Sequence, residues 1–120
     1  MELCYQLLNF DLDKAQAVLR HLESAAPGGY ACLTSVVLGD YSCSYRNQHT
    51  MAWLAKDPRF AAFSSTVHER GLKLLYQLPH VVKEGEFSAT VEFVRRHWSV
   101  VDGFVTGDLG VLTALDRMVR

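Results

Sequence analysis

The chain has 120 residues, of which 49% are hydrophobic and 21% are charged, and its formal net charge is −1 at pH 7. This length suits one domain, which buries roughly two-thirds of the surface that the unfolded chain exposes. The small net charge provides no electrostatic attraction to nucleic acid or to an anionic membrane, so neither is expected as a partner. No apolar run approaches the roughly 20 residues that span a bilayer, and no signal segment opens the chain, so we expect a soluble cytoplasmic protein.

Short apolar segments alternate with helical patterns along the chain. In order, the expected elements are a strand at 2–10, a helix from residue 12 to the Pro27-Gly28-Gly29 stop, and a strand at 30–38. A loop at 39–48 and two helical pieces at 50–55 and 59–70 follow. The remaining elements are a strand at 72–78, a helix at 84–97, a strand at 100–106 and a last helix after Gly110.

This alternation predicts an α/β fold of four consecutive βα units, which form a single domain over residues 1–120. Such units are joined by right-handed crossovers and build a parallel sheet with helices outside it. Two closures fit the pattern: a small open sheet, or half of an eight-stranded (βα)8 TIM-like barrel. A half-barrel has open sheet edges, which a partner chain or a further segment must cover.

Polar residues follow each predicted strand, at the edge where βα proteins collect their ligands. The candidate ligand-binding residues are Asn9, Asp40, Arg46, His80 and Asp108. The alternative is that these are ordinary turn and cap residues, since Asn and Asp hydrogen-bond their own backbone in turns. Asp108 in particular is placed to cap the last helix.

The three cysteines are an odd number in a short chain, which argues against a disulfide framework. Cys4 and Cys32 lie in apolar runs and are expected in the core. Cys43 lies outside such runs and close to Arg46, whose charge would lower the pKa of the thiol. One cysteine cannot hold an iron–sulfur cluster, which needs about four ligands.

The five histidines form no metal-ligand pattern in the sequence. A nucleophilic Cys43 would need a base, and His49 or His80 could serve only if the fold brought one of them within hydrogen-bonding reach. His21, His68 and His97 lie near predicted helix ends, where we expect them at the surface.

Two short stretches suggest a family. Residues 38–46 read L-G-D-Y-S-C-S-Y-R and residues 107–111 read G-D-L-G-V. With their separation, they resemble the amino-terminal half of the collagenase-like peptidases, family thirty-two of unknown catalytic type. The most similar members are the UbiV-type accessory proteins of oxygen-independent ubiquinone biosynthesis, and the resemblance covers about residues 30–115.

The resemblance implies a barrel-like βα fold and pairing with a related subunit. It also implies that the cysteine at the Cys43 position helps to ligate a four-iron–four-sulfur cluster. The other cluster cysteines of such proteins belong to a carboxyl-terminal half that these 120 residues do not contain. A cluster here would therefore need cysteines from a partner or from a segment outside this chain.

Three hypotheses follow. The first is an accessory, non-catalytic protein that assembles with itself or with a related subunit around a strand-end ligand or iron–sulfur site. The second is an enzyme of the peptidase-like or oxygen-independent hydroxylation type that uses Cys43, Arg46 and Asp108. The third is a fragment of a longer protein with no independent function.

Overall fold

The computed structural model describes residues 3–6, 12–25, 33–39 and 44–119. The strands are β1 (Leu3–Gln6), β2 (Leu33–Leu38), β3 (Lys73–Gln77) and β4 (Gly103–Val105). The helices are α1 (Leu12–Ala25), α2 (Ser44–Leu54), α3 (Arg59–Glu69), α4 (Glu84–His97) and α5 (Leu109–Val119). None of the described helices is long and apolar enough to cross a membrane.

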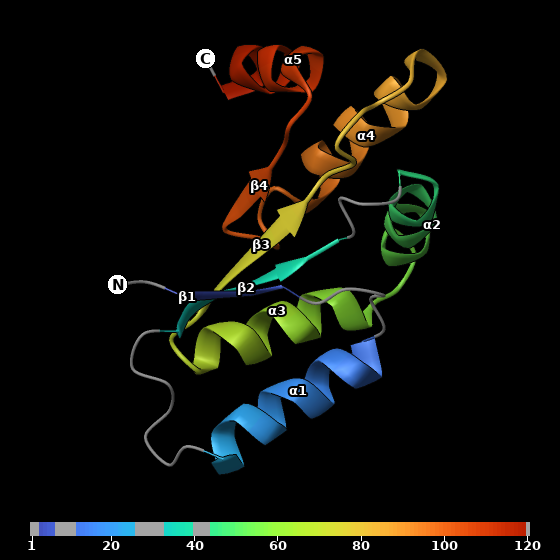
Figure 1. The fold of residues 1–120 in the computed structure, drawn as a ribbon. Coiled ribbons are helices and arrows are strands. Elements are labelled where there is room, and N and C mark those ends of the chain that lie inside the picture. The colour runs from blue at the N-terminus through green and yellow to red at the C-terminus, as the bar shows by residue number, and fades with distance from the viewer. Residues whose placement is uncertain (1–2, 7–11, 26–32, 40–43, 120) are drawn as a thin grey trace.

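The four strands form one parallel sheet in the order β1-β2-β3-β4. Parallel crossovers share one hand, so strands in sequential order carry their connecting helices on the same face of the sheet. Figure 1 shows the helices below, to the right of and above the strands, while the left side is open. The α/β fold of four βα units is confirmed.

The sequential strand order also distinguishes between the two closures. A doubly wound open sheet reverses its strand order at a switch point and carries helices on both faces. A (βα)8 barrel keeps its strands in sequence, with every helix outside. The described residues follow the second pattern, so the arrangement is that of half of such a barrel.

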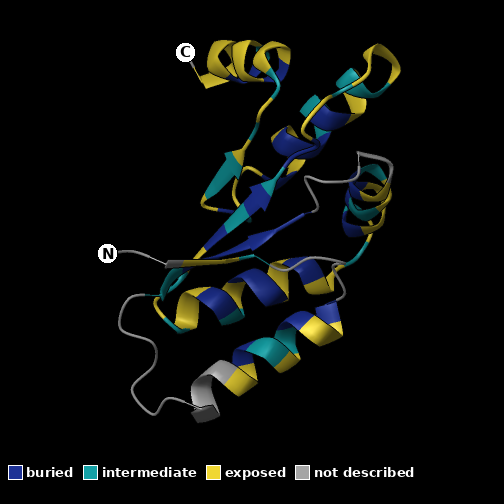
Figure 2. Ribbon diagram, in the orientation of Figure 1, coloured by how far each residue is buried: buried dark blue, intermediate teal, exposed yellow. Residues whose placement is uncertain are grey.

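The face of the sheet that meets the helices, here called the outer face, forms the core. Val36, Leu38, Leu74 and Tyr76 point to this face and are almost completely buried. The Tyr76 ring lies 4.9 Å from that of Phe93 in α4, measured between centroids. Burying an apolar side chain of this size contributes roughly 1.5–3 kcal/mol, so this layer fixes how the helices pack. Figure 2 shows the buried residues along the strands and along the sheet-facing sides of the helices.

The opposite face of the sheet is here called the inner face. From the register and the alternation of side chains, its residues are Cys4, Gln6, Ser35, Val37, Lys73, Leu75, Gln77, Gly103 and Val105. Ser35 and Val37, on central strand β2, are buried, whereas Lys73 and Val105 are exposed. No described helix covers this face.

Three expectations about local structure were wrong. The predicted loop at 39–48 is shorter, because α2 begins at Ser44, so Arg46 lies in a helix. The strand predicted at 100–106 is only Gly103–Val105, since Val100 and Val101 donate backbone hydrogen bonds to His97 in the turn after α4. Cys4 is exposed rather than in the core, because it lies on the inner face, where Ser35 Oγ donates to its Sγ at 2.8 Å.

Candidate functional site

Two glutamine side chains lie where the strands end. Gln77 Nε2 donates hydrogen bonds to the carbonyl of Leu78 at 3.1 Å and to that of Val105 at 3.2 Å, which ties the end of β3 to the end of β4. Gln6 Nε2 donates to the carbonyl of Gly39 at 3.4 Å and so ties β1 to the residue after β2. The carboxyl ends of the strands therefore carry amide groups on the inner face.

Gly39 permits a close backbone approach at this edge. Its φ is +96°, in the region that glycine adopts readily, and a Cβ at this position would lie 2.2 Å from the carbonyl oxygen of Gln77. Any side chain would push the ends of β2 and β3 apart. The glycine in the stretch 38–46 is thus required by the geometry of the sheet end.

A buried asparagine holds α2 against the same edge. Asn47 is completely buried, and its Nδ2 donates to the carbonyl of Gln77 at 2.8 Å. Its Oδ1 accepts a hydrogen bond of 2.8 Å from the hydroxyl of Tyr76. Burial raises the pKa of Tyr76 far above its ordinary value, so the hydroxyl stays protonated and remains a donor.

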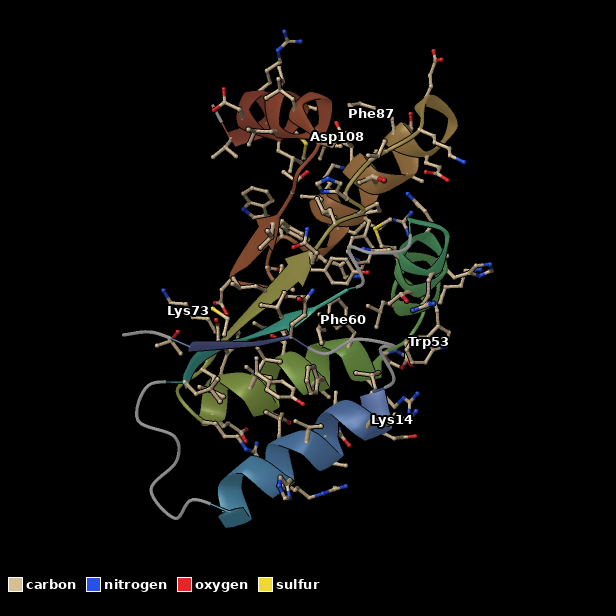
Figure 3. The ribbon with its side chains drawn as sticks, in the orientation of Figure 1. Lys14, Trp53, Phe60, Lys73, Phe87 and Asp108 are labelled. Atoms are coloured by element: carbon tan, nitrogen blue, oxygen red, sulfur yellow. The ribbon has the colours of Figure 1, made fainter. Side chains whose placement is uncertain are left out.

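His80 and Asp108 lie on adjoining loops. The chain after β4 passes so close to His80 that a Cβ on Gly107 would lie 2.6 Å from its Nδ1. Asp108 Oδ2 accepts a hydrogen bond from the amide of Val82, and its Oδ1 accepts one from the amide of Val111, each at 3.0 Å. Asp108 therefore caps α5 and also anchors the loop after β3. Figure 3 shows it at the start of α5.

The hydrogen bonds from Val82 and Val111 lower the pKa of Asp108. Both of its oxygens thus have backbone donors, as the helix-cap interpretation of this residue predicted. The carboxylate is half-buried and remains at the strand-end edge, next to exposed His80.

The other candidate residues are less well placed for a common site. Arg46 is exposed in the first turn of α2. Asn9, Asp40 and Cys43 lie outside the described residues. Within the ranges that the structure describes, no three His, Cys, Asp or Glu side chains gather as metal ligands do. The described residues consequently do not fit an iron–sulfur cluster, which needs about four ligands.

A second polar pair lies at the opposite, amino-terminal end of β3 and β4. His68 Nε2 lies 2.7 Å from Asp102 Oδ2, which also accepts a 2.7 Å hydrogen bond from the amide of Leu74. Burial raises the pKa of Asp102, but the hydrogen bonds from Leu74 and His68 lower it by more. His68 is at the surface, as expected. His97 is not: it is buried between Phe60 and Phe93, so that prediction was wrong.

Sequence reasoning missed Gln6, Asn47 and Gln77. Each acts through a partner more than 25 residues away, and no local pattern marks such a partner. A signal for Asn47 did exist, because Asn47, Met51 and Leu54 recur at helical spacing and are all buried.

Replacing Asp108 with alanine should lower the free energy of unfolding by about 1–2 kcal/mol at pH 7, the usual cost of losing a capping side chain. The folded-state pKa of Asp108 lies below its ordinary value of 3.8. Its stabilisation is therefore complete above that value and is lost as the pH falls through the folded-state pKa. Urea unfolding at pH 7 and near pH 2 should show the deficit shrinking in acid.

Glu69→Ala is the matched control for this change, since Glu69 is an exposed carboxylate at the end of α3. It should alter stability by less than about 0.5 kcal/mol. A deficit for Asp108→Ala no larger than this, or one that does not depend on pH, would contradict the capping role.

No protein-family model matches this chain, and neither does any curated protein or solved structure with which it was compared.

Proposed function

We propose that this is an accessory, non-catalytic protein that acts by assembly with itself or with another chain. Assembly covers the inner face of the half-barrel, and the strand-end residues Gln6, Gln77, His80 and Asp108 form part of a ligand site there. The proposal includes the relationship to the collagenase-like peptidases that residues 38–46 and 107–111 suggest. The barrel-like βα arrangement supports that relationship, because the resemblance implies such a fold.

The observation that carries the proposal is an inner face that no described helix covers, in a described sheet whose edge strands are β1 and β4. Within the described part of the chain, β1 pairs only with β2, and β4 pairs only with β3. An exposed strand edge presents unpaired backbone groups, which bind another strand readily. In a complete barrel, both edges and the inner face are covered by further βα units.

Exposed apolar side chains near the β4 edge support the same conclusion. Val105 at the end of β4 is 40% exposed, and Leu109 and Leu112 in α5 are 76% and 52% exposed. In a barrel, the next βα unit would lie against this side of the molecule. Apolar residues gathered on one side of a protein mark a surface that binds another protein.

Charge placed on this surface should prevent assembly. For Val105→Glu, we expect the mass in solution, measured by light scattering, to fall to that of one chain, because a carboxylate is costly to bury without a partner. The wild-type protein should have the mass of two or more chains, or should copurify with a second chain that the variant loses.

Ala62→Glu is the control. Ala62 is exposed on α3, on the helical side of the molecule and away from the inner face and the strand-end loops. It should leave the assembly unchanged. If wild-type protein is monomeric at all concentrations and has no partner that Val105→Glu releases, the proposal is wrong.

A further inference from the structure

The four strands are staggered along their own direction, as the strands of a closed barrel are. Phe104, at the centre of β4, pairs with Tyr76, and Tyr76 pairs with Leu38. Leu38 lies one position beyond the partner of Gln6, which is 1.5 residues past the centre of β1, so β4 is displaced by 2.5 residues from β1 over three steps between strands. An eight-stranded barrel with a shear number of 8 requires about one residue per step. The stagger therefore fits half of such a barrel.

Neither edge strand carries the side chains that often prevent pairing at the edge of a sheet. Natural edge strands are commonly protected by charged residues or by proline. The sequences of β1 and β4 are L-C-Y-Q and G-F-V, which contain neither. Tyr5 on β1 is 39% exposed, and Val105 on β4 is 40% exposed. Both edges of the described sheet are therefore suited to pairing with a further strand.

The stagger determines which residues meet if the β1 edge of a second copy pairs with the β4 edge. Val105 pairs with Gln77, which lies four positions after Lys73. Lys73 pairs with Ser35, and Ser35 pairs with Cys4. The four steps of half a barrel shift the register by about four residues, so Cys4 of the second copy lies opposite Val105. Both residues belong to the inner face, and both are exposed in the single chain.

The outer side of the β4 edge is apolar as well. Trp98, directly after α4, is 50% exposed, and its ring stacks on that of Phe104 with the centroids 6.2 Å apart. These two rings and Leu115 in α5 help to line a hollow of about 230 Å³ beside β4. The outer face of β1 presents the exposed ring of Tyr5. Apolar groups on both sides of the β4 edge favour an entering strand that is itself apolar, as β1 is.

We propose that the partner is a second copy of this chain, and that two copies close one eight-stranded barrel. This inference rests on the proposed function, since it names the chain that covers the inner face. The two copies are related by a twofold axis, so β4 of each copy pairs with β1 of the other. Both edges of each sheet are used at once, and no strand edge of the two described sheets is left open.

The strand-end site is incomplete in one chain under this arrangement. The carboxyl ends of the eight strands form one rim, to which each copy contributes Gln6, Gln77, His80 and Asp108. In the same register, Gln6 of the second copy lies opposite Gly107, the residue that packs closely against His80. A ligand on this rim contacts both copies, so its binding stabilises the dimer.

A disulfide between Val105→Cys and the native Cys4 tests the register. Neighbouring strands lie about 4.8 Å apart, within the Cα separation that a disulfide spans. Within one chain the two positions are three strands apart, at least about 14 Å, so only a bond between copies can form. With oxidised glutathione as the oxidant, most Val105→Cys chains should run at the mass of two chains on a non-reducing gel. An open head-to-tail array would instead give a ladder of larger species.

Two variants control for unspecific cross-linking. Adding Cys4→Ser to Val105→Cys should abolish the linked dimer, because it removes the thiol that lies opposite residue 105. Ala62→Cys places a thiol on the exposed side of α3, far from either edge of the sheet. It should give no more linked dimer than the wild-type protein.

A pair of opposite charges tests the same contact without a covalent bond. Val105→Glu and Cys4→Lys should each lower the mass in solution to that of one chain, because each variant buries a charge without a partner. The variant that carries both changes should regain the mass of two chains, since a carboxylate then meets an ammonium group at each junction. A partner chain of different sequence would not restore assembly in this double variant.

The results distinguish this inference from the proposed function. If Val105→Glu releases a different chain, and neither the Cys4-dependent disulfide nor the rescue by the paired charges is seen, the inference is wrong and the proposed function stands. If the wild-type protein is monomeric at all concentrations and has no partner, both are wrong. A ladder of linked species would overturn the closed barrel. If a Cys4 variant does not fold, the gel of Val105→Cys alone decides between dimer, ladder and monomer.

Discussion

Replacing Asn47 with leucine is expected to lower the free energy of unfolding by roughly 2–5 kcal/mol, because two buried groups lose their hydrogen-bond partner. The amide group of Asn47 serves both the carbonyl of Gln77 and the hydroxyl of Tyr76. Leucine has a similar size but no polar atom, so neither group regains a partner. Chemical denaturation followed by circular dichroism measures the loss.

A double-mutant cycle with Tyr76→Phe makes this prediction sharper. The single change at Tyr76 leaves one acceptor without its donor and should cost about 1–2 kcal/mol. The double variant should cost less than the two single changes together, because it lacks the Tyr76 hydroxyl that Asn47→Leu leaves without a hydrogen-bond partner. Additivity within about 0.5 kcal/mol would show that the Asn47–Tyr76 hydrogen bond contributes little to stability.

Gly39→Ala should destabilise the protein by at least about 3 kcal/mol, because two penalties combine. The residue has a φ of +96°, which an alanine adopts only with strain, and its new Cβ would lie 2.2 Å from the carbonyl oxygen of Gln77. The clash involves backbone, so the ends of β2 and β3 must separate. The Asn47 contact to the same carbonyl would be disturbed as well.

Gly71→Ala separates the two penalties. Gly71 also has a positive φ, +72°, but a Cβ there meets nothing within 4 Å. Its cost should be only the backbone strain, about 1–2 kcal/mol. Thermal or urea unfolding of both variants gives the difference between their losses of stability. This difference measures the cost of the clash between a Cβ at residue 39 and the carbonyl of Gln77. An equal loss of stability for the two variants would mean that the ends of β2 and β3 can separate at little energetic cost.

The fold could be predicted because its signals are local. Apolar runs bounded by turn residues marked the strands, and α4 was placed at residues 84–97, the range that the structure shows. The break at Asp57-Pro58 also lies where expected, with Asp57 accepting a hydrogen bond from the amide of Arg59. Gly71, expected as the stop after α3, has the positive φ of such an ending.

The features that the sequence did not indicate depend on contacts with residues far away along the chain. The first turns of α2 contain few apolar residues, and this helix is positioned by Asn47 through groups some 30 residues away. Cys4 looked like a core residue because it lies in an apolar run and free cysteine is among the most buried residue types. In the described sheet β1 is an edge strand, and both Cys4 on its inner face and Tyr5 on its outer face are exposed.

The burial of His97 could have been predicted from the hydrophobic spacing in α4, but its position at the end of the helix suggested a surface location. Thr90, Phe93, Val94 and His97 are spaced as one face of a helix, and all four are buried. The position of His97 at the end of the helix favoured the surface interpretation, because a cationic histidine there would complement the helix dipole. The apolar neighbours of the ring proved the stronger influence. Hydrophobic spacing is the better guide for a histidine whose neighbours on that face are apolar.

The sequential strand order has a consequence for how the chain folds. Among the described residues, each strand pairs only with the strand of a neighbouring βα unit. A molecule built this way approaches a one-dimensional array, whose stability is the sum of its units and of the interfaces between neighbours. Within the described sheet, the β1–α1 and β4–α5 units each lie beside one other unit, whereas the units between them lie beside two. Folding of such an array can begin in any unit and spread to its neighbours.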